Sequence, residues 1–313
     1  MESNLFKFAI DVKSGALACP DATAFYTKAL IKQTDINHFN AIPGVKDSGR
    51  IPMLNSGKLL KSFNCGWSDV TVDLDGKLIK VDRLSMMVEV CQEDIEKSMF
   101  GQAMAIGSNN SMVNNPIEFS KALWDYLGGK VNEEIEELRW LGDKTSANTF
   151  LKLTDGYLAR VNANTASLAS KIDSITGGVT PANVIAELTK IVSAIPVAVD
   201  ETEIKLFVSR NIWLAYLVAS NLLNAQAGIT GNLGNGFLGN YTIVPVSFLP
   251  ANTAIATRQA DIAYAFDNEP EQMVVVDMYE SNAVPTVRYR VNLKVGFDFA
   301  TYANTVLYSP VAG

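Results

Sequence analysis

Residues 115–141, NPIEFSKALWDYLGGKVNEEIEELRWL, predict one long amphipathic helix around which the rest of the chain can be placed. Asn115 suits the N-cap, and Pro116 suits the first helical position, where its missing N–H costs no hydrogen bond. The pattern ends at Gly142, a suitable C-terminal stop. The helix carries no chemically reactive group, so we expect it to be structural. Apolar side chains recur every three or four residues and define its buried face: Ile117, Leu123, Trp124, Leu127, Val131, Ile135 and Leu138.

The composition describes a folded chain with a substantial core. It has 313 residues, of which 48% are hydrophobic and 19% charged, enough for one large domain or two smaller ones. The net charge of −7 argues against nucleic-acid binding as the main role, because such surfaces need clustered Lys and Arg. The most apolar segment, 212–223, is too short to span a bilayer. Residues 1–21 lack the basic flank and apolar run of a signal peptide, so we expect no membrane association.

The sequence shows no recognisable catalytic, cofactor-binding or metal-binding motif. Cys19, Cys65 and Cys91 lie far apart without a CxxC pair, which argues against a zinc site; Cys65 and Cys91 would be neighbours only if their strands pair. The single histidine, His38, has no nucleophile motif around it and is interpreted as structural. The glycine-rich run 228–239 lacks the Lys-Ser/Thr of a P-loop and follows a helix, so we interpret it as a loop. We therefore predict no catalytic, cofactor-binding or metal-binding residue and no cofactor.

Residues 50–91 show the alternation and turn signals of β-structure. Asp75-Gly76 is a two-residue hairpin signal between alternating arms, and residues 84–91 alternate again. The hairpin around it has few apolar side chains and would be marginal in isolation. We therefore expect an arm that finds its support on another subunit.

Residues 144–250 read as a compact lobe in which strands and helices alternate. Residues 180–195 predict a helix with Thr180 as its cap and Pro181 at the first helical position. The lobe also contains a short, fully apolar strand, an uncharged helix and a further strand: 204–209, 210–224 and 241–249.

The last part of the chain returns to strands. Residues 254–266 are expected to hold one strand, and 273–281 another that is buried on both faces. Residues 284–300 alternate between an apolar face and a basic face, predicted to lie in solvent or at an interface. The last two strands would form a long hairpin that needs a helix over its apolar face, and 115–141 is the obvious candidate. This places the two ends of the chain in one lobe, with 144–250 inserted as another.

Five sequence blocks, in this order and spacing, resemble the major capsid proteins of tailed double-stranded DNA bacteriophages, most closely those of phages infecting Bacteroidetes bacteria. No single block is diagnostic, because that family has no catalytic signature. The blocks span most of the chain from about 40 to 300: PGVKDSGRIPML with FNCGWSD, LSMMVEVCQEDIEKSMF, NEEIEELRWLGD with LTDGYLARV, YTIVPVSFLPANTAIAT, and MVVVDMYESNAVPTVRYRVNLKVGFDFA.

This resemblance implies an α+β fold of the Hong Kong 97 type, in which 115–141 is the spine helix. The loose N-terminal arm and the weakly cored hairpin would be ordered by neighbouring subunits. The implied domains are an N-terminal arm at 1–40, an extended β-hairpin loop at 41–83, a peripheral domain with the spine helix at 84–143, an apical domain at 144–250, and closing strands of the peripheral domain at 251–313.

The implied role is structural and not enzymatic: a major capsid subunit that self-assembles into hexamers and pentamers of an icosahedral shell around phage double-stranded DNA. Head-to-tail contacts that close into rings generate such assemblies. The acidic balance suits a shell that encloses DNA without sequence-specific binding. The implied partners are further copies of the chain and portal, scaffolding and decoration proteins. The expected location is the virion, after assembly in the bacterial host cytoplasm.

Two features of the family do not carry over. Some members crosslink Lys to Asn covalently; Lys58 and Lys61 lie in the expected loop, but no partner can be matched to them. Some members carry an N-terminal scaffolding segment. Because only a short stretch precedes residue 20, a separate scaffolding protein is expected here.

Two alternatives remain open at this stage, and a further one is argued against. An encapsulin-type shell would share the fold but enclose protein, so the content of the shell discriminates. An α/β enzyme would use carboxylates such as Asp94, Asp143 or Asp155 for acid–base chemistry and would need them to converge in a pocket. A double jelly-roll coat conflicts with the long helix and the α/β lobe.

Overall fold

The computed structural model describes residues 38–56, 72–91, 116–196, 199, 203–226, 237–267, 273–278 and 286–310. Two compact units contain them. The first includes Asp82–Ile135 and Phe266–Val295, and the second includes Ile36–Val81, Glu136–Ala265 and Gly296–Gly313. The ranges of these two units differ from those of the five domains predicted above, so the unit boundaries do not test the predicted domains, which remain predictions.

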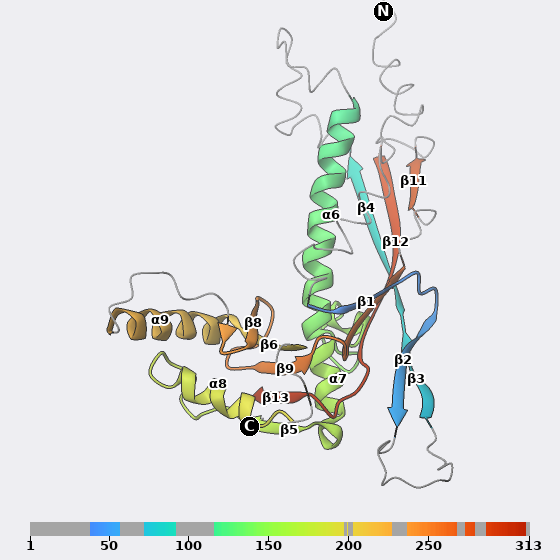
Figure 1. The fold of residues 1–313 in the computed structure, drawn as a ribbon. Helices are drawn as coiled ribbons and strands as arrows, with labels where there is room; N and C mark the ends of the chain where they lie inside the picture. Colours follow the sequence, from blue (N-terminus) through green and yellow to red (C-terminus); the bar gives the residue numbers. More distant parts are fainter. Residues whose placement is uncertain are drawn as a thin grey trace, which may run out of the picture. The chain divides into compact units, whose positions relative to one another are not determined.

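The elements in chain order are β1 (Asn40–Pro43), β2 (Ser48–Ser56), β3 (Val72–Lys80), β4 (Asp82–Cys91), α6 (Pro116–Leu141), the 3-10 helix η1 (Leu151–Leu153), α7 (Tyr157–Ala163), the 3-10 helix η2 (Thr165–Ser167), β5 (Ser170–Asp173), α8 (Val184–Ser193), β6 (Ile204–Ser209), α9 (Arg210–Gln226), β7 (Phe237–Leu238), β8 (Tyr241–Val246), β9 (Ala254–Arg258), β10 (Ile262–Asp267), β11 (Met273–Met278), β12 (Thr286–Phe299) and β13 (Val306–Ser309). Figure 1 labels most of them.

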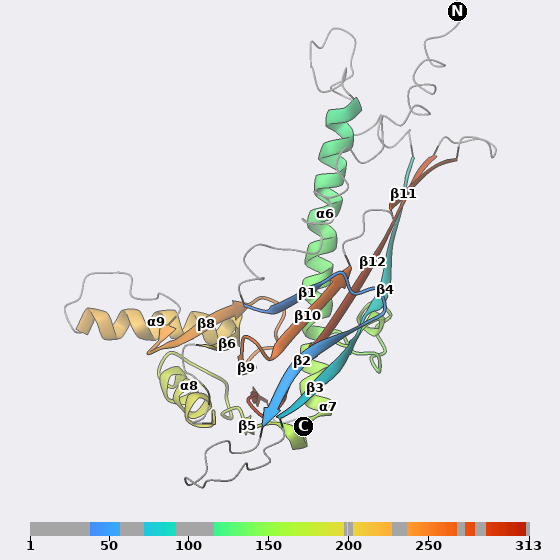
Figure 2. The same cartoon turned by 45° about the vertical axis from the view of Figure 1, so that its right-hand side comes forward.

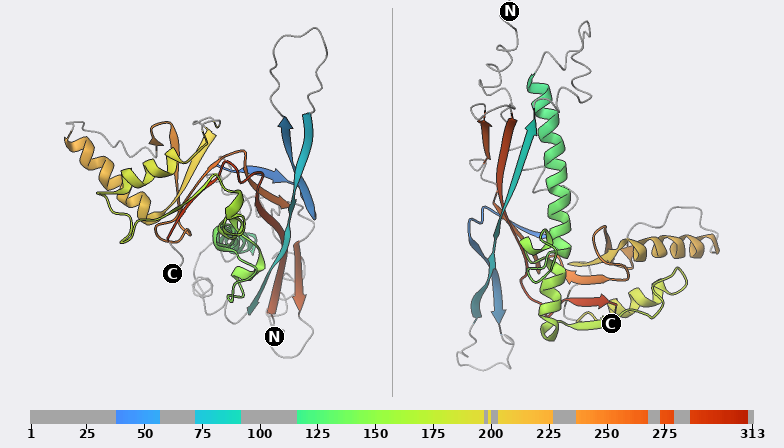
Figure 3. Two further views of the ribbon diagram at one scale, coloured as in Figure 1. Left: turned by 90° about the horizontal axis from the view of Figure 1, so that it is seen from below. Right: turned by 180° about the vertical axis from the view of Figure 1, so that it is seen from behind.

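The long helix is confirmed as α6, which begins at Pro116 and ends at Leu141. In the first unit its predicted stripe is buried at Trp124, Leu127 and Val131. The same unit contains an antiparallel sheet in which β12 lies between β4 and β11. Figures 1 and 3 show α6 running along one side of these strands, as the apolar stripe requires.

The pairing of β12 explains the predicted alternation of apolar and polar residues, but the environment predicted for one residue is wrong. Val291 and Leu293 are buried, and they pair with Met86 and Leu84 of β4. Lys294, predicted on a face in solvent or at an interface, is buried instead, with its Nζ 2.7 Å from Asp267 Oδ2. Burying a charge is costly unless it is paired, and the carboxylate of β10 supplies the partner.

The hairpin predicted at Asp75-Gly76 is wrong. These residues lie inside β3, which pairs with β2 over nine positions from Ser48↔Lys80 to Ser56↔Val72. A two-residue turn at Asp75-Gly76 would leave only short arms, whereas the β2–β3 pairing satisfies many more backbone groups. The chain between β2 and β3 lies outside the described residues.

The second unit contains a six-stranded sheet in the order β5-β13-β9-β6-β8-β7. One face of this sheet packs on α8 and α9 through side chains such as Leu206, Val208, Ala256 and Tyr308. Figures 2 and 3 show the two helices together beside these strands. The core on this face is continuous because alternate residues of each strand point toward the helices.

Two further expectations for this region change. Residues 254–266 form two strands and not one: β9 joins the six-stranded sheet, whereas β10 lies between β1 and β12 in another. The turn at Gln259–Asp261 separates them, since Asp261 N–H donates to Arg258 O and ends the strand.

The predicted boundary at residue 250 passes through the six-stranded sheet. On one side of it lie β5 and β6, and on the other lie β9 and β13, which pair with them and with each other.

The helix expected at 180–195 is shorter at its start. It begins at Val184, and Asn183 occupies the N-cap position instead of Thr180. Asn183 Oδ1 accepts a hydrogen bond from the backbone N–H of Thr180 at 2.7 Å, which holds a turn over the residues that were expected to be helical.

Candidate functional site at the base of the β2–β3 hairpin

A small core in the second unit holds the base of the β2–β3 hairpin. Ile51 of β2 and Ile79 of β3 are almost fully buried. They pack with Ala263 and Ala265 of β10 and with Ala300. The neighbouring residue Leu78 points the other way and is 48% exposed, as expected from the alternation along a strand. The hairpin is therefore attached through one face of its base.

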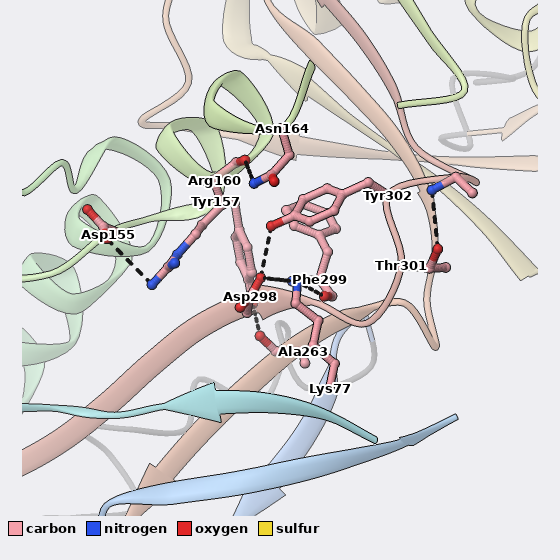
Figure 4. A network of polar contacts seen from close by, with 11 residues as sticks. Lys77, Asp155, Tyr157, Arg160, Asn164, Ala263, Asp298, Phe299, Thr301 and Tyr302 are labelled. Atoms are coloured by element: carbon pink, nitrogen blue, oxygen red, sulfur yellow. Dashed lines mark hydrogen bonds and ion pairs between the residues drawn. The ribbon is translucent and has the colours of Figure 1, made fainter. Parts of the chain in front are cut away.

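Lys77 provides a polar anchor at the same place. Its Nζ donates to Asp298 Oδ1 at 2.8 Å and to the carbonyl oxygen of Phe299 at 2.6 Å. It also lies 4.3 Å from the centre of the Tyr302 ring, within the range of a cation–π interaction. Figure 4 shows this network. One lysine thus joins β3 to the end of β12 and the loop after it.

Asp298 is the centre of the anchor. Besides Lys77, its Oδ1 accepts hydrogen bonds from the Phe299 backbone N–H at 2.7 Å and from the Tyr302 hydroxyl at 3.0 Å. The pKa of the Tyr302 phenol is raised, mainly by burial and to a smaller extent by the adjacent Asp298 carboxylate. The phenol therefore remains a hydrogen-bond donor throughout the neutral pH range.

Gly296 permits the close approach of β12 to the end of β3. A Cβ built on it would lie 2.3 Å from the carbonyl oxygen of Lys80 and 3.1 Å from a methyl group of Val81. The first distance is to a backbone atom, which cannot rotate away. Only glycine fits this position of β12.

The end of α6 forms a second packed junction within the second unit, which we call the aromatic junction: Phe39, Trp140, Tyr157 and Phe207. The ring centres of Trp140 and Phe207 are 5.2 Å apart, and those of Trp140 and Tyr157 are 5.3 Å apart. Phe207 points away from α8 and α9, so the sheet is buried on both faces.

Asp143 and Asp155, the carboxylates considered above for acid–base chemistry, hold the turns that follow α6. Asp143 Oδ1 accepts from the hydroxyl and the backbone N–H of Thr145, at 2.6 and 2.8 Å. These two hydrogen bonds lower the pKa of Asp143, and the one from the hydroxyl has the larger effect. Asp155 Oδ1 accepts from the Lys144 backbone N–H at 3.0 Å, and its Oδ2 lies 3.5 Å from Arg160. Both carboxylates serve their local turns.

Several positions considered in the sequence lie outside the described residues: Asp94, Lys58, Lys61, Cys19 and Cys65. Cys91 ends β4, where its backbone pairs with Thr286. His38 lies just before β1 and is half-buried. Only the end of the glycine-rich run 228–239 is described, where Phe237–Leu238 forms β7.

The described residues contain no group of three or more His, Cys, Asp or Glu side chains able to hold a metal ion. Within the same ranges, no helix is long and apolar enough to cross a membrane. The prediction that the chain has no catalytic, cofactor or metal residue stays a prediction.

Sequence reasoning missed Lys77, Asp298 and Tyr302 as a group. The available signal was Asp298 itself, an acidic residue between Phe297 and Phe299 near the end of the strand. A charge at such a position needs a partner. The identity of that partner could not be read, since Lys77 lies more than two hundred residues away in the sequence.

Comparison with known proteins places the fold. No family model matches the sequence, and no curated protein matches it either. A chain of the satellite phage P4 procapsid superposes with a TM-score of 0.62 at 12% identity, covering 98% of this chain and 97% of that one. A chain from the capsid of a native GTA particle gives 0.55 at 14% identity, with 91% of each chain covered. The capsid of Myoviridae phage XM1 gives 0.52 at 13% identity, with coverage of 90% and 92%.

These similarities extend over almost the whole of both chains, at identities too low to identify more than the architecture. The mixed helix-and-sheet arrangement described above is the one that these procapsid and capsid chains share. The chain has the α+β, Hong Kong 97-type fold.

Proposed function

We propose that this chain is the major capsid subunit of a tailed double-stranded DNA bacteriophage. Copies of it would assemble into hexamers and pentamers that close into an icosahedral shell around the genome. The observation that carries this proposal is the full-length match to chains from a procapsid and from capsids. A structural role without catalysis follows from the same proposal.

The exposed apolar side chains support a subunit that is completed by neighbours. Large hydrophobic residues are half-exposed or more on several elements, among them Tyr126 on α6 and Met87 on β4. Leu214 and Val218, about half exposed, lie one turn apart on α9. Single exposed hydrophobics are common, but a pair on one helix face favours burial in an assembly.

Within this proposal α6 is the spine helix of the peripheral domain, and the β2–β3 hairpin is the extended loop. The range 144–250 remains the proposed apical domain, and 1–40 the proposed N-terminal arm. The shell would form in the cytoplasm of a bacterial host, proposed from the sequence resemblance to be a member of the Bacteroidetes. Portal, scaffolding and decoration proteins are its proposed partners.

The test is electron microscopy of the purified protein over a range of concentration and salt. We expect closed shells, rings or tubes. When the protein is produced in infected cells, we expect the shells to hold DNA. Shells that hold a packaged protein would contradict the phage assignment in favour of an encapsulin-type shell. A persistent monomer under every condition would overturn the proposal.

A further inference from the structure

In the sheet of the first unit, one face is covered, and the other is exposed along β4 but not at Lys294 of β12. Along β4, Leu84, Met86 and Val88 are half-buried, whereas the residues between them are exposed. The half-buried residues lie on the same face as Val291 and Leu293 of β12, which are buried. This is the face along which α6 runs. The exposed face of β4 carries Arg83, Ser85, Met87 and Glu89.

The exposed face combines positive charge with an apolar centre. Met87 is 64% exposed, and Arg290 of β12 lies directly opposite it in the register. Arg83 lies opposite Lys294, whose charge is already paired with Asp267. Among the described residues, the guanidinium groups of Arg83 and Arg290 take part in no ion pair and no side-chain hydrogen bond. The exposed methionine therefore has one arginine directly opposite it on β12 and another four residues before it on β4, both with their charges available.

The chemistry of this face fits a protein partner better than a nucleic acid. Met and Arg are enriched at the centres of protein interfaces. A phosphate backbone would favour a continuous basic surface, but Glu89 is exposed on this face and Met87 projects from its middle. A partner with an acidic surface and an exposed aromatic or apolar side chain would suit it.

Such a surface lies on the outer face of α6. Tyr126 is 68% exposed, and seven residues later Glu133 lies on the same helix face, since seven residues make nearly two turns. Between Asp125 and Glu134 the exposed charged side chains are three carboxylates and one ammonium, a net charge of −2. The ammonium, Lys130, is already bound to Glu133 at 2.7 Å.

These two surfaces point away from one another in a single subunit. α6 lies along the covered face of the sheet, so its outer face and the Met87 face are on opposite sides of the first unit. The two surfaces therefore cannot contact one another within one subunit, but they can meet between neighbouring subunits in a row. A contact between two different surfaces of identical chains is head-to-tail and closes into a ring when the rotation allows.

We propose that the face formed by Arg83, Met87 and Arg290 binds the outer face of α6, around Tyr126 and Glu133, on a second copy of this chain. This inference rests on the proposed shell function and adds to it the residues of one contact between subunits. The exposed methionine would pack against the tyrosine, and the arginines would lie against the carboxylates.

The experiment exchanges the charges. Arg83→Glu with Arg290→Glu, and separately Glu133→Lys with Glu134→Lys, should each lower the fraction of protein in particles at least tenfold in sedimentation and electron microscopy. The chain with all four substitutions should recover to within about twofold of the wild type, because its two surfaces are complementary again. The matched control is Lys171→Glu with Asp173→Lys, two exposed charges on β5, which should assemble like the wild type.

A mixture of the two double variants gives a second readout. Each would assemble far better with the other than alone, so particles should form in the mixture and should contain both variants. All variants change exposed residues, and their circular dichroism and unfolding midpoints should match the wild type, which separates assembly from folding.

Double variants that assemble like the wild type, or a fourfold variant no better than the doubles, would overturn the inference and leave the shell function intact. Normal particles with less packaged DNA in the arginine variant would overturn it in favour of a nucleic-acid contact. A wild-type chain that never assembles would remove the proposed function itself, and this contact with it.

Discussion

The base of the β2–β3 hairpin and the aromatic junction both connect distant parts of the second unit, but by different physical means. The hairpin base uses one partly exposed lysine, Lys77, a buried carboxylate and a small core of aliphatic side chains. The aromatic junction uses stacked rings that are almost completely buried, with glycines where the backbones meet.

This difference suggests separate roles: the aromatic junction stabilises the fold of the second unit, and the hairpin base positions the β2–β3 hairpin. Burial of large rings contributes strongly to folding free energy, whereas a partly exposed ion pair contributes little because water screens it. We therefore expect damage at the aromatic junction to unfold the unit. Damage at the hairpin base should leave the unit folded and change mainly where the hairpin points, which is visible only in assembly.

The largest effect is expected for Gly156→Ala, beside the aromatic junction. The added Cβ would lie 2.5 Å from Leu138 O and 2.6 Å from Arg139 O. Both are backbone atoms of α6 that cannot rotate away, so the loss of stability should exceed the roughly 1–3 kcal/mol typical of overpacked cores and be at least as large as that of Trp140→Ala. Soluble yield and urea unfolding measure it.

Gly129→Ala is the matched control for this glycine. Gly129 lies within α6, and a Cβ there meets nothing within 4 Å. Inside a helix, alanine is more favourable than glycine by about 1 kcal/mol, so the control should be at least as stable as the wild type. If Gly156→Ala unfolded at the same urea concentration as this control, the proposed close approach would be wrong.

Trp140→Ala should follow, with a loss of about 3–5 kcal/mol, the usual cost of removing a large aromatic side chain from a core. Trp140 is 2% exposed and touches three other rings. Urea unfolding followed by circular dichroism gives the value. Trp140→Phe keeps a ring and should lose clearly less; equal losses would mean that ring packing is not the main contribution.

Lys77→Met should cost only about 1–2 kcal/mol, because the lysine side chain is 29% exposed and Asp298 keeps two other donors. The yield of assembled particles should fall much more than the stability does. Adding Asp298→Asn should cost less than the sum of the two single changes, since they share one interaction. Unchanged particle yield for Lys77→Met would show that the anchor does not position the hairpin.

The smallest effect is expected for Tyr302→Phe and depends on pH. The pKa of Tyr302 is raised above its ordinary value near 10 in the folded chain, so the unfolded chain loses this proton first. The folding stability contributed by the phenol is therefore complete below pH 10 and falls as the pH rises above it, by at most about 1.4 kcal/mol per pH unit. Tyr302→Phe removes this dependence.

Urea midpoints at pH 9 and pH 11 compare the two proteins. The wild type should lose more stability over this interval than Tyr302→Phe. Tyr308, whose pKa burial raises to about 12, is present in both proteins and cancels in the difference. Parallel curves would contradict the position given to the Tyr302 hydroxyl.

Elements with a strong local period could be predicted from the sequence. The helix expected at 115–141 is α6, Pro116–Leu141, and the strand expected at 204–209 is β6, Ile204–Ser209. In both, the spacing of apolar residues matches the geometry of the element, and no distant partner is needed to recognise it.

Pairing choices could not be predicted in the same way. Asp75-Gly76 carries a genuine turn signal, yet β3 passes straight through it because β2 offers a longer pairing. Residues 254–266 look like one apolar strand, but a turn divides them between two sheets. A local signal loses in both regions to hydrogen bonds with strands far away in the sequence.

By itself, the sequence determined the long helix, the strand-rich ends of the chain and, through the order of its blocks, the resemblance to a capsid fold. Only the tertiary structure decided which carboxylate each of two lysines meets: Asp298 for the partly exposed Lys77 and Asp267 for the buried Lys294. The reason is physical. Periodicity is a property of neighbouring residues, whereas the partner of a buried charge depends on which strands lie side by side.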